Sequence, residues 1–492
     1  MIRPIRRLLI ANRGEIACRI IETARKLGIA TVAVQHRLDH KAPHAILADE
    51  VMEIEGETPV GAYLDSSQLV RAAIQKGCDA IHPGYGFLSE NASFALAVRE
   101  AGLIFVGPGA ETIRLMGDKI TARDFAVRHD VPVSPSVMAD GDLSRFATDA
   151  SRIGFPLLIK AAAGGGGKGM SIVRSLDDLI ERAALAAGEA GRYFGDNRIY
   201  AERYVERPRH IEVQIVGDGK GNVIHLGDRE CSIQRRFQKI IEEAPSVNLP
   251  DNLRAAMIDS ALRLASAACY ENVGTVEFIV APDGAYYFLE MNTRLQVEHR
   301  VTEMVCGLDI VAIQLAIASG DGLPDQGSIQ FKGSAIECRI CAENPDRDFM
   351  PETGRVLGIV HPRQPWSIFD SGLSEGQVIG TNFDPMLAKL VTHGASRAEA
   401  VERMTQAIRC TTILGVVTNL DYLGRIIEHP GFLAGDLHTG FLVEHAPSLA
   451  PHALGAQELI DILIAAAMSN PGLQRLIDDV PEPYALAGGW RN

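Results

Sequence analysis

The sequence predicts a multidomain protein of the α/β and α+β classes, with a parallel sheet first and mixed, largely antiparallel sheets after it. Three observations support this prediction. The chain has 492 residues, more than one hydrophobic core usually holds. Short apolar runs alternate with helical segments over residues 1–117. From residue 209 onward the apolar runs lengthen and alternate with polar residues, which is typical of antiparallel strands.

The N-terminal part opens with the apolar run LLIAN and the helical segment EIACRIIETARKLG. Further apolar runs follow as TVAVQ, CDAIHPGYGF and LIFVG. Strands that alternate with helices imply a parallel sheet, which binds ligands at the carboxyl ends of its strands. The first turn reads Ala-Asn-Arg-Gly rather than GxGxxG, so a dinucleotide cofactor is not indicated.

A second unit begins near Pro132 and contains the glycine run Gly164–Gly167 between the apolar runs 156–160 and 171–173. A Walker loop would need Gly and Ser or Thr where Ala162 and Gly169 stand. We therefore interpret this segment as a strand–loop–strand hairpin whose backbone N–H groups can close over phosphates. An ordinary loop or linker explains a glycine run equally well.

Alternating polar residues follow the apolar run 287–289. A strand that continued to residue 298 would place five polar side chains on one face: Glu290, Asn292, Arg294, Gln296 and Glu298. Glu277 adds a carboxylate on an expected neighbouring strand. Carboxylate and amide oxygens are the hard ligands that Mg²⁺ requires. The alternative, a solvated face, does not explain why this ordered set follows so apolar a run.

Composition and cysteine usage limit the classes of function. The formal charge of −14 argues against a broad nucleic-acid surface. No apolar run is long enough for a secretory signal or a membrane span, so we expect a cytoplasmic protein without a membrane partner. Cys338 and Cys341 form a CxxC in an expected strand, with no second pair to complete a zinc site. We expect neutral, reduced thiols.

Four cationic residues stand in apolar or motif-like settings: Lys119, Lys160, Lys239 and Arg339. Each one alone is compatible with a solvated surface charge. Together with the carboxylates and the glycine run, they fit the neutralisation of a polyphosphate.

From Ile5 to His445 the sequence resembles the biotin carboxylase family of the ATP-grasp superfamily. Seven motifs in order carry the resemblance: IANRGEIACRI, IHPGYGFLSEN, MGDK, GGGGKGM, PRHIEVQ, ECSIQRR-x-QK-x-x-EEAP and EMNTRLQVEH. The resemblance implies an ATP-grasp architecture with an N-terminal Rossmann-like domain, a small lid domain and a mixed or antiparallel C-terminal domain. The expected parts are 1–117 (Rossmann-like), 118–205 (segment with the glycine lid), 206–330 (catalytic half), 331–445 (C-terminal domain) and 446–492 (linker and helical tail).

The resemblance also implies residue roles. Expected ATP ligands are Lys119, Lys160, Gly164, Gly165, Gly166, Gly167, Glu202, Arg203, Val205, His210 and Gln234. The expected Mg²⁺ or Mn²⁺ ligands, serving two metal sites, are Glu277, Glu290 and Asn292. The expected bicarbonate pocket is Lys239, Arg294, Gln296 and Val297, and the expected biotin site is Gly86 and Arg339. The expected catalytic residues are Glu298 as general base, Arg294, Lys239, and Arg339 for stabilising the biotin enolate.

The implied activity is ATP-dependent carboxylation of biotin with bicarbonate through carboxyphosphate, the first half-reaction of a biotin-dependent acyl-CoA-type carboxylase. Another ATP-grasp ligase, such as a carbamoyl-phosphate or purine-pathway enzyme, and an inactive ATP-binding subunit are the alternatives. Phe237, Ser334 and Arg300 depart from the family pattern. They bear on rate and carrier recognition, while no assigned acid, base or ligand is replaced.

No Met-Lys-Met triplet, the family's biotin attachment site, occurs in the sequence. We therefore expect biotin to arrive on a separate biotin carboxyl carrier protein, with a carboxyltransferase subunit as a further partner and a homodimer as the assembly. The tail PEPYALAGGWRN resembles the junction at which acyl-CoA carboxylase α-chains enter their next domain; a plain tail is the alternative.

Overall fold

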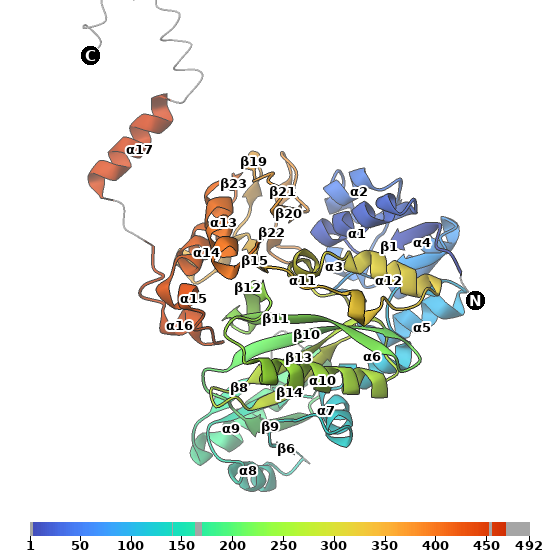
Figure 1. The fold of residues 1–492 in the computed structure, drawn as a ribbon, viewed down its shortest axis with the longest axis vertical. Helices are drawn as coiled ribbons and strands as arrows, with labels where there is room; N and C mark the ends of the chain where they lie inside the picture. The colour runs from blue at the N-terminus through green and yellow to red at the C-terminus, as the bar shows by residue number, and fades with distance from the viewer. Residues whose placement is uncertain (1–2, 140, 163–169, 452–454, 469–492) are drawn as a thin grey trace, which may run out of the picture. The chain divides into compact units, whose positions relative to one another are not determined.

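The structure is a computed structural model that describes residues 3–139, 141–162, 170–451 and 455–468. It divides the chain into two units, Met1–Leu449 and Ala450–Asn492. The first unit contains three principal sheets (Figure 1). The second contains one described helix, α17, at Ala456–Met468, where the sequence predicted a helix.

The first sheet is parallel, as predicted, with the strand order β3-β2-β1-β4-β5. Its strands are β1 Arg7–Ile10, β2 Ala30–Gln35, β3 Glu50–Glu53, β4 Ala80–His82 and β5 Ile104–Phe105. The helices of this part are α1 Gly14–Lys26, α2 Pro43–Leu47, α3 Pro59–Tyr63, α4 Ser66–Gln75, α5 Ala92–Glu100 and α6 Ala110–Gly117. The amide of Asn12, just after β1, donates to the carbonyls of Pro83 and Tyr85 after β4. The loops at the carboxyl ends of β1 and β4 are thereby tied together.

A four-stranded antiparallel sheet with the order β6-β9-β7-β8 forms the small domain. Its strands are β6 Ser136–Met138, β7 Leu157–Ala161, β8 Ser171–Val173 and β9 Ile199–Arg203. The helices α8 Leu143–Ser151 and α9 Leu176–Phe194 pack on it. The predicted hairpin is confirmed by the antiparallel pairing of β7 with β8. The glycine run between these strands, Gly164–Gly167, lies outside the described residues.

The third sheet has eight strands in the order β14-β13-β10-β11-β12-β15-β22-β20, and every neighbouring pair is antiparallel, as predicted. The strands are β10 Arg209–Asp218, β11 Val223–Arg235, β12 Gln238–Ala244, β13 Glu271–Val280, β14 Tyr286–Asn292, β15 Ser334–Cys341, β20 Ser367–Ser371 and β22 Met386–Gly394. Asp218 closes the β10–β11 turn by accepting from the main-chain N–H groups of Lys220 and Asn222. This strand order joins segments that are far apart in the sequence.

The two faces of the eight-stranded sheet differ in chemistry. On β10 the apolar side chains Ile211 and Val213 are buried with those of the helix α10, Asp251–Ala267. The intervening Glu212 points to the other face, because successive side chains alternate along a strand. There it is flanked in register by Arg229 on β11 and Glu277 on β13. A buried charged row therefore runs along one face of the sheet.

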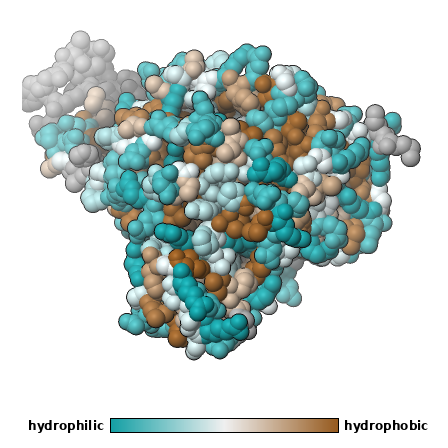
Figure 2. All heavy atoms as spheres, turned by 60° about the horizontal axis from the view of Figure 1, so that its bottom comes forward, coloured by the Kyte–Doolittle hydropathy of each residue, from teal (hydrophilic) through white to brown (hydrophobic). Residues whose placement is uncertain are grey.

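The remaining elements complete the first unit. The helices are α7 Lys119–Arg128, α11 His299–Cys306, α12 Ile310–Ser319, α13 Arg397–Arg409, α14 Leu420–Ile427, α15 Pro430–Ala434 and α16 Phe441–Glu444. The short strands are β16 Glu343–Asn344, β17 Met350–Pro351, β18 Gly354–Arg355, β19 Gly358–Val360, β21 Val378–Ile379 and β23 Thr412–Leu414. Within the described residues no single helix is long and apolar enough to cross a membrane; α11 and α12 reach that length and composition only as a pair bent by 93°. On the face in Figure 2, apolar side chains reach the surface in separate groups among hydrophilic ones.

Candidate active site

A cavity of about 380 Å³ opens on the charged row. It is lined by nearly all of the predicted site residues: Lys119, Lys160, Glu202, Arg203, Val205, His210, Gln234, Lys239, Glu277, Glu290, Asn292, Arg294, Gln296, Val297, Glu298 and Arg339. Gly86 is not among the lining residues, and Gly164–Gly167 lie outside the part of the chain that the structure describes. The fold thus gathers into one space side chains that are spread over residues 119–339 of the sequence.

Lys239 lies at the centre of the charged row. Its Nζ donates to Glu212 Oε2 at 2.5 Å, Glu298 Oε1 at 2.7 Å and Glu277 Oε1 at 2.9 Å. Burial disfavours the ammonium ion, but the surrounding acidic groups raise the pKa of Lys239 well above its ordinary value. One permanent cation therefore connects the predicted base, Glu298, with the predicted metal ligand, Glu277.

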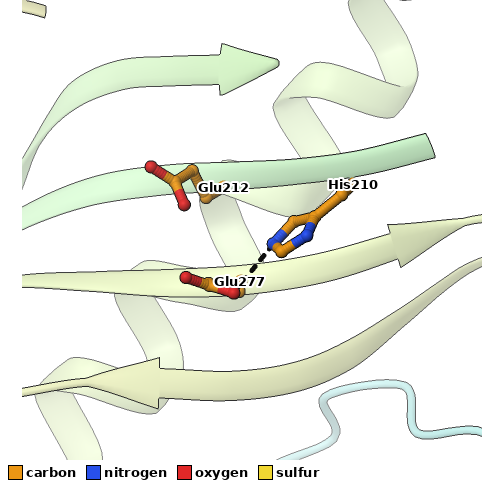
Figure 3. A group of neighbouring side chains, drawn as sticks. All are labelled: His210, Glu212 and Glu277. Atoms are coloured by element: carbon orange, nitrogen blue, oxygen red, sulfur yellow. Dashed lines mark ion pairs between the residues drawn. The ribbon is translucent and has the colours of Figure 1, made fainter. Parts of the chain in front are cut away.

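Figure 3 shows His210, Glu212 and Glu277, whose ligand atoms lie close enough to hold a metal ion. His210 Nε2 lies 2.7 Å from Glu277 Oε2 (Figure 3). Glu212 instead accepts from Arg229 Nε at 2.5 Å and from Lys239. Two cations already compensate the Glu212 carboxylate, so we interpret this trio as part of the ion-pair network rather than as a separate metal centre.

The oxygen atoms suited to Mg²⁺ converge where β13 meets β14. Glu277 pairs in register with Glu290, and Thr275 with Asn292. Asn292 Nδ2 donates to Glu277 Oε1 at 2.6 Å, while the Glu290 carboxylate is partly exposed to the cavity and lies 3.4 Å from Lys119 Nζ. Two carboxylates and an amide form a hard-oxygen set that leaves room for phosphate oxygens, so these residues fit the implied Mg²⁺.

The predicted strand through residue 298 is wrong beyond Asn292. β14 ends at Asn292, and residues 293–298 form a turn that leads into α11; we call it the site turn. A polar residue at every second position has the same spacing in a strand and in this turn, so the sequence pattern did not show where the strand ends. Arg294 fixes the turn: its guanidinium donates to Glu90 at 2.8 Å, Gln296 Oε1 at 2.8 Å and Asn292 Oδ1 at 3.0 Å.

Glu298 is 1% exposed and lies between two cations. Lys239 Nζ lies 2.7 Å from Oε1, and Arg339 Nη2 lies 2.9 Å from Oε2. Burial opposes ionisation, but Lys239 and then Arg339 hold the pKa of Glu298 well below its ordinary value. The carboxylate is therefore ionised and able to accept a proton, as a general base must be.

The other end of the cavity carries the predicted ATP residues. Lys160 Nζ lies 2.5 Å from Glu202 Oε1, and Arg123 holds the second oxygen of Glu202 at 3.0 Å. Burial opposes ionisation of Glu202, yet these two cations lower its pKa. Lys119 opens α7 directly after Asp118, whose carboxylate caps the helix by accepting from the N–H of Thr121. The MGDK motif is thus a helix start that presents a lysine to the cavity.

Gly86 lies in the loop after β4, with a backbone φ of +66° that residues other than glycine rarely adopt. The loop borders the site through other residues: Glu90 accepts from Arg294 and from the N–H of Thr293. The structure thus places the predicted biotin residue beside the site turn but outside the lining of the cavity.

Sequence reasoning missed several buried ionisable residues that lie behind the lining of the cavity: Glu212, Arg229, Glu242, Glu337 and Lys389. Lys389 is fully buried and donates to the carbonyl of Val297 at 2.9 Å, inside the site turn. Glu212 and Lys389 interrupt largely apolar strands, as in HIEVQIV and MLAKLV, and this is the signal that could have identified them. Arg229, between Asp228 and Glu230, and Glu242, beside Glu243, stand in charged surroundings that give no such signal.

The three departures from the family pattern are spread over the site and its surroundings. Arg300 donates to Asp370 at 2.6 and 2.8 Å and to Glu303 at 2.9 Å, so two carboxylates compensate its charge. Phe237 lines the cavity and is 46% exposed. Ser334 opens β15.

The CxxC cysteines are both free thiols, as expected. Burial raises the pKa of Cys338 well above its ordinary value, and burial likewise raises the pKa of Cys341. Both thiols are therefore neutral at physiological pH and poor metal ligands.

Three family models match the chain in sequence order. The model "Biotin carboxylase, N-terminal domain" matches residues 4–113, and "Carbamoyl-phosphate synthase L chain, ATP binding domain" matches residues 118–326. The model "Biotin carboxylase C-terminal domain" matches residues 337–444. Together they cover most of the first unit.

Relatives and solved structures agree with these models. The chain is 45% identical to the biotin carboxylase of Nostoc sp., covering 89% of this chain and 98% of that protein. It is 41% identical to the mitochondrial methylcrotonoyl-CoA carboxylase subunit alpha of Dictyostelium discoideum, covering 100% and 71%. It spans only 42% of mouse mitochondrial pyruvate carboxylase, at 40% identity.

The biotin carboxylase domain dimer of Hydrogenobacter thermophilus 2-oxoglutarate carboxylase, crystallised with MgADP, ADP and bicarbonate, aligns with a TM-score of 0.89 at 40% identity. The alignment covers 92% of this chain and 100% of that one. A nucleotide complex of Campylobacter jejuni biotin carboxylase aligns with a TM-score of 0.86 at 40% identity, covering 90% and 99%. The predicted ATP-grasp fold is thereby confirmed.

Proposed function

This chain belongs to the biotin carboxylase family, and we propose that its cavity carries out the family reaction with the residues assigned here. The reaction is the ATP-dependent carboxylation of biotin with bicarbonate, the first half-reaction of a biotin-dependent carboxylase. One observation supports the assignment most strongly. Glu298, ionised between Lys239 and Arg339, shares one cavity with a hard-oxygen set and two lysines suited to phosphates.

At one end of the cavity, Lys119 and Lys160 would bind the ATP phosphates. Glu202, Arg203 and Val205 would line the adenine site. Glu277, Glu290 and Asn292 would hold Mg²⁺ or Mn²⁺ in two sites. The metal would offset charge on the phosphates. Gly164–Gly167, outside the described residues, would cover the nucleotide, because carboxyphosphate is unstable in water.

At the other end, Lys239, Arg294, Gln296 and Val297 would bind bicarbonate. Glu298 takes the proton of bicarbonate, and a bicarbonate oxygen then attacks the γ-phosphorus while ADP leaves. The carboxyphosphate breaks into CO₂ and phosphate. Phosphate removes the proton of the biotin ureido nitrogen, and that nitrogen attacks CO₂. Arg339, always charged, stabilises the negative charge that develops on the ureido oxygen.

Partners and location are further parts of the proposal. We propose that biotin is presented to the cavity by a biotin carrier domain and that a carboxyltransferase later uses the carboxybiotin, as the names of the related carboxylases suggest. The Hydrogenobacter domain crystallised as a dimer, which supports a homodimer for this chain. A cytoplasmic location stays a prediction, to be tested by cell fractionation.

The direct test is ADP release by the purified chain with and without bicarbonate and free biotin. The proposal requires release that depends on bicarbonate and rises with biotin. A carbamoyl-phosphate-type ligase would need ammonia or glutamine instead, and an inactive ATP-binding subunit would release no ADP. ADP release should be faster with a biotinylated carrier than with free biotin, because docking of the carrier raises the effective concentration of the biotin ring.

A further inference from the structure

Two carboxyl groups behind Arg339 have no part in the proposed chemistry. Glu242 on β12 and Glu337 on β15 are direct cross-strand partners. Both are fully buried, at 0% exposure. Paired strands lie about 4.8 Å apart, so the two carboxyl groups share one dry space next to the site. We call them the Glu242–Glu337 pair.

The two members are bonded very differently. Glu242 Oε1 accepts from Arg339 Nε at 2.6 Å and lies 2.5 Å from Arg339 Nη2. Neither oxygen of Glu337 has a hydrogen-bond partner among the described residues. Lys389, the cation that acts on Glu337 most strongly, is engaged elsewhere: it donates to the Val297 carbonyl at 2.9 Å and lies 3.3 Å from Glu15.

Two adjacent carboxyl groups without solvent cannot both be ionised, because each negative charge raises the energy of the other. The arginine fork stabilises a charge on Glu242, whereas no donor stabilises one on Glu337. We propose that Glu337 holds a proton so that Glu242 can stay ionised and fix Arg339 between itself and Glu298. Glu242 is then a positioning residue for Arg339. The inference rests on the proposed function, since it assigns Arg339 a task in carboxylation.

The surroundings favour this division of roles. The titratable groups that act on the pair are Lys239 on β12, Cys231 on β11, Arg339 on β15, Lys389 on β22 and Glu298 in the site turn. Cys338, next to Glu337 on β15, points to the opposite face, and α11, which packs on β12 and β15, begins with His299 and Arg300. Burial keeps His299 and both thiols neutral, and Arg300 is paired with Asp370. Burial raises the pKa of Glu242 to about 7 and that of Glu337 well above its ordinary value. Burial thus opposes ionisation of both carboxyl groups, and the arginine fork, which only Glu242 accepts from among the described residues, decides which of the two is ionised.

The division matters when Glu298 takes the proton of bicarbonate. Arg339 Nη2 then loses one of its two charged partners, Glu298 at 2.9 Å, and keeps the other, Glu242 at 2.5 Å. Ionised Glu242 retains the guanidinium through both Nε and Nη2, so the guanidinium keeps its orientation beside the cavity for the ureido oxygen. Without that anchor, the guanidinium would be free to rotate about its side chain, and charge stabilisation would be lost.

The experiment compares Glu242→Gln with Glu337→Gln, two isosteric variants of neighbouring residues. Glu242→Gln should lower kcat for biotin carboxylation about 10- to 100-fold, the scale of a hydrogen bond to a charged group. Its KM for ATP should stay unchanged, and the limb of the kcat–pH profile near neutrality should shift or disappear. Glu337→Gln should keep kcat within about twofold and keep that limb, because an amide replaces an already neutral acid.

Infrared spectroscopy locates the proton without relying on activity. At mildly alkaline pH the wild type should have a carboxylic acid C=O band that is missing from Glu337→Gln and therefore appears in the difference spectrum of the two proteins. Glu242→Gln should still have this band. Equal losses of kcat in the two variants, or no acid band lost in Glu337→Gln, would overturn the inference. If Glu242→Gln does not fold, Glu242→Asp, with a shorter reach to Arg339, takes its place with the same expected direction. A wild-type protein that does not carboxylate biotin would refute the proposed function instead, and the acid band would still show whether Glu337 is protonated.

Discussion

The two faces of the eight-stranded sheet are buried to a similar degree but for different reasons. One face packs Ile211, Val213 and Phe278 against α10 and holds the domain together. The other face buries Glu212 and Arg229 completely and Lys239 in large part, so these charged groups give up hydration to be there. Buried ion pairs of this kind contribute little net stability compared with apolar residues of similar size. The comparison indicates that one face is selected for stability and the other for chemistry.

The largest expected effect comes from the charged face at Glu290. Glu290→Gln should lower Mg²⁺-dependent ADP release about 100- to 1000-fold, because it removes the negative charge of a proposed ligand of the metal that offsets charge on the transferring phosphate. The thermal midpoint should stay close to that of wild type, since Glu290 is partly exposed. Glu111→Gln, at a solvent-exposed carboxylate on α6, serves as the control. Unchanged turnover in Glu290→Gln would refute the metal assignment.

The next effect concerns the base. Glu298→Gln should lower biotin carboxylation by about 100-fold or more, the scale of general-base catalysis, while Mg·ATP still binds. Isothermal titration with a nonhydrolysable ATP analogue separates binding from chemistry. An equal fall in nucleotide affinity would make Glu298 a nucleotide or metal ligand instead.

The apolar face should show the opposite behaviour. Leu264, fully buried on α10, packs within the core of that face. Leu264→Ala should reduce the free energy of unfolding by about 2–5 kcal/mol through lost burial and a cavity. The kcat of the protein that remains folded should not change. Urea denaturation and kcat measured below the transition check both parts; a loss of kcat without a loss of stability would contradict the division between the faces.

A smaller effect is expected in the pH dependence of stability. Burial raises the pKa of Glu15, at the start of α1, to about 7 from the 4.5 of an exposed glutamate. Between these values the folded protein holds a proton that the unfolded chain releases, so stability falls as pH rises through this window. One such group contributes a slope of at most about 1.4 kcal/mol per pH unit.

Glu15→Gln cannot release that proton and should show a flatter decline of stability between these pH values. Urea melts of both proteins at several pH values give the difference directly. A steeper decline in the variant than in wild type would contradict the raised pKa of Glu15.

Local sequence patterns were sufficient for the features that depend on neighbouring residues. The sequence predicted the parallel sheet from alternating strand and helix patterns, and it predicted the β7–β8 hairpin from two apolar runs around a glycine run. Family motifs predicted the residues that line the cavity. Each of these signals lies within a short continuous stretch of the chain. The prediction that the strand continues to Glu298 was wrong, because polar residues also occur at every second position in the turn that follows β14. Boundaries of this kind depend on tertiary contacts such as Arg294 with Glu90.

The sequence alone did not predict which charged residues come together on the buried face of the sheet. Glu242, Glu337 and Lys389 come from strands that are neighbours only in the folded sheet, and their partners follow from its register. Each residue alone is compatible with a solvated strand position. Only the strand order shows that these charges share one buried space.

In the proposed reaction, Glu298 activates bicarbonate as the nucleophile toward the γ-phosphate of ATP, and we claim this role above all others. Bicarbonate labelled with ¹⁸O tests this most directly, because the attacking oxygen stays on phosphorus when carboxyphosphate breaks down. Mass spectrometry of the phosphate released in one turnover should find one ¹⁸O from bicarbonate in the wild type and almost no product in Glu298→Gln. Phosphate without ¹⁸O, whose fourth oxygen then comes from water, would show that water attacks ATP directly, and it would contradict the claim.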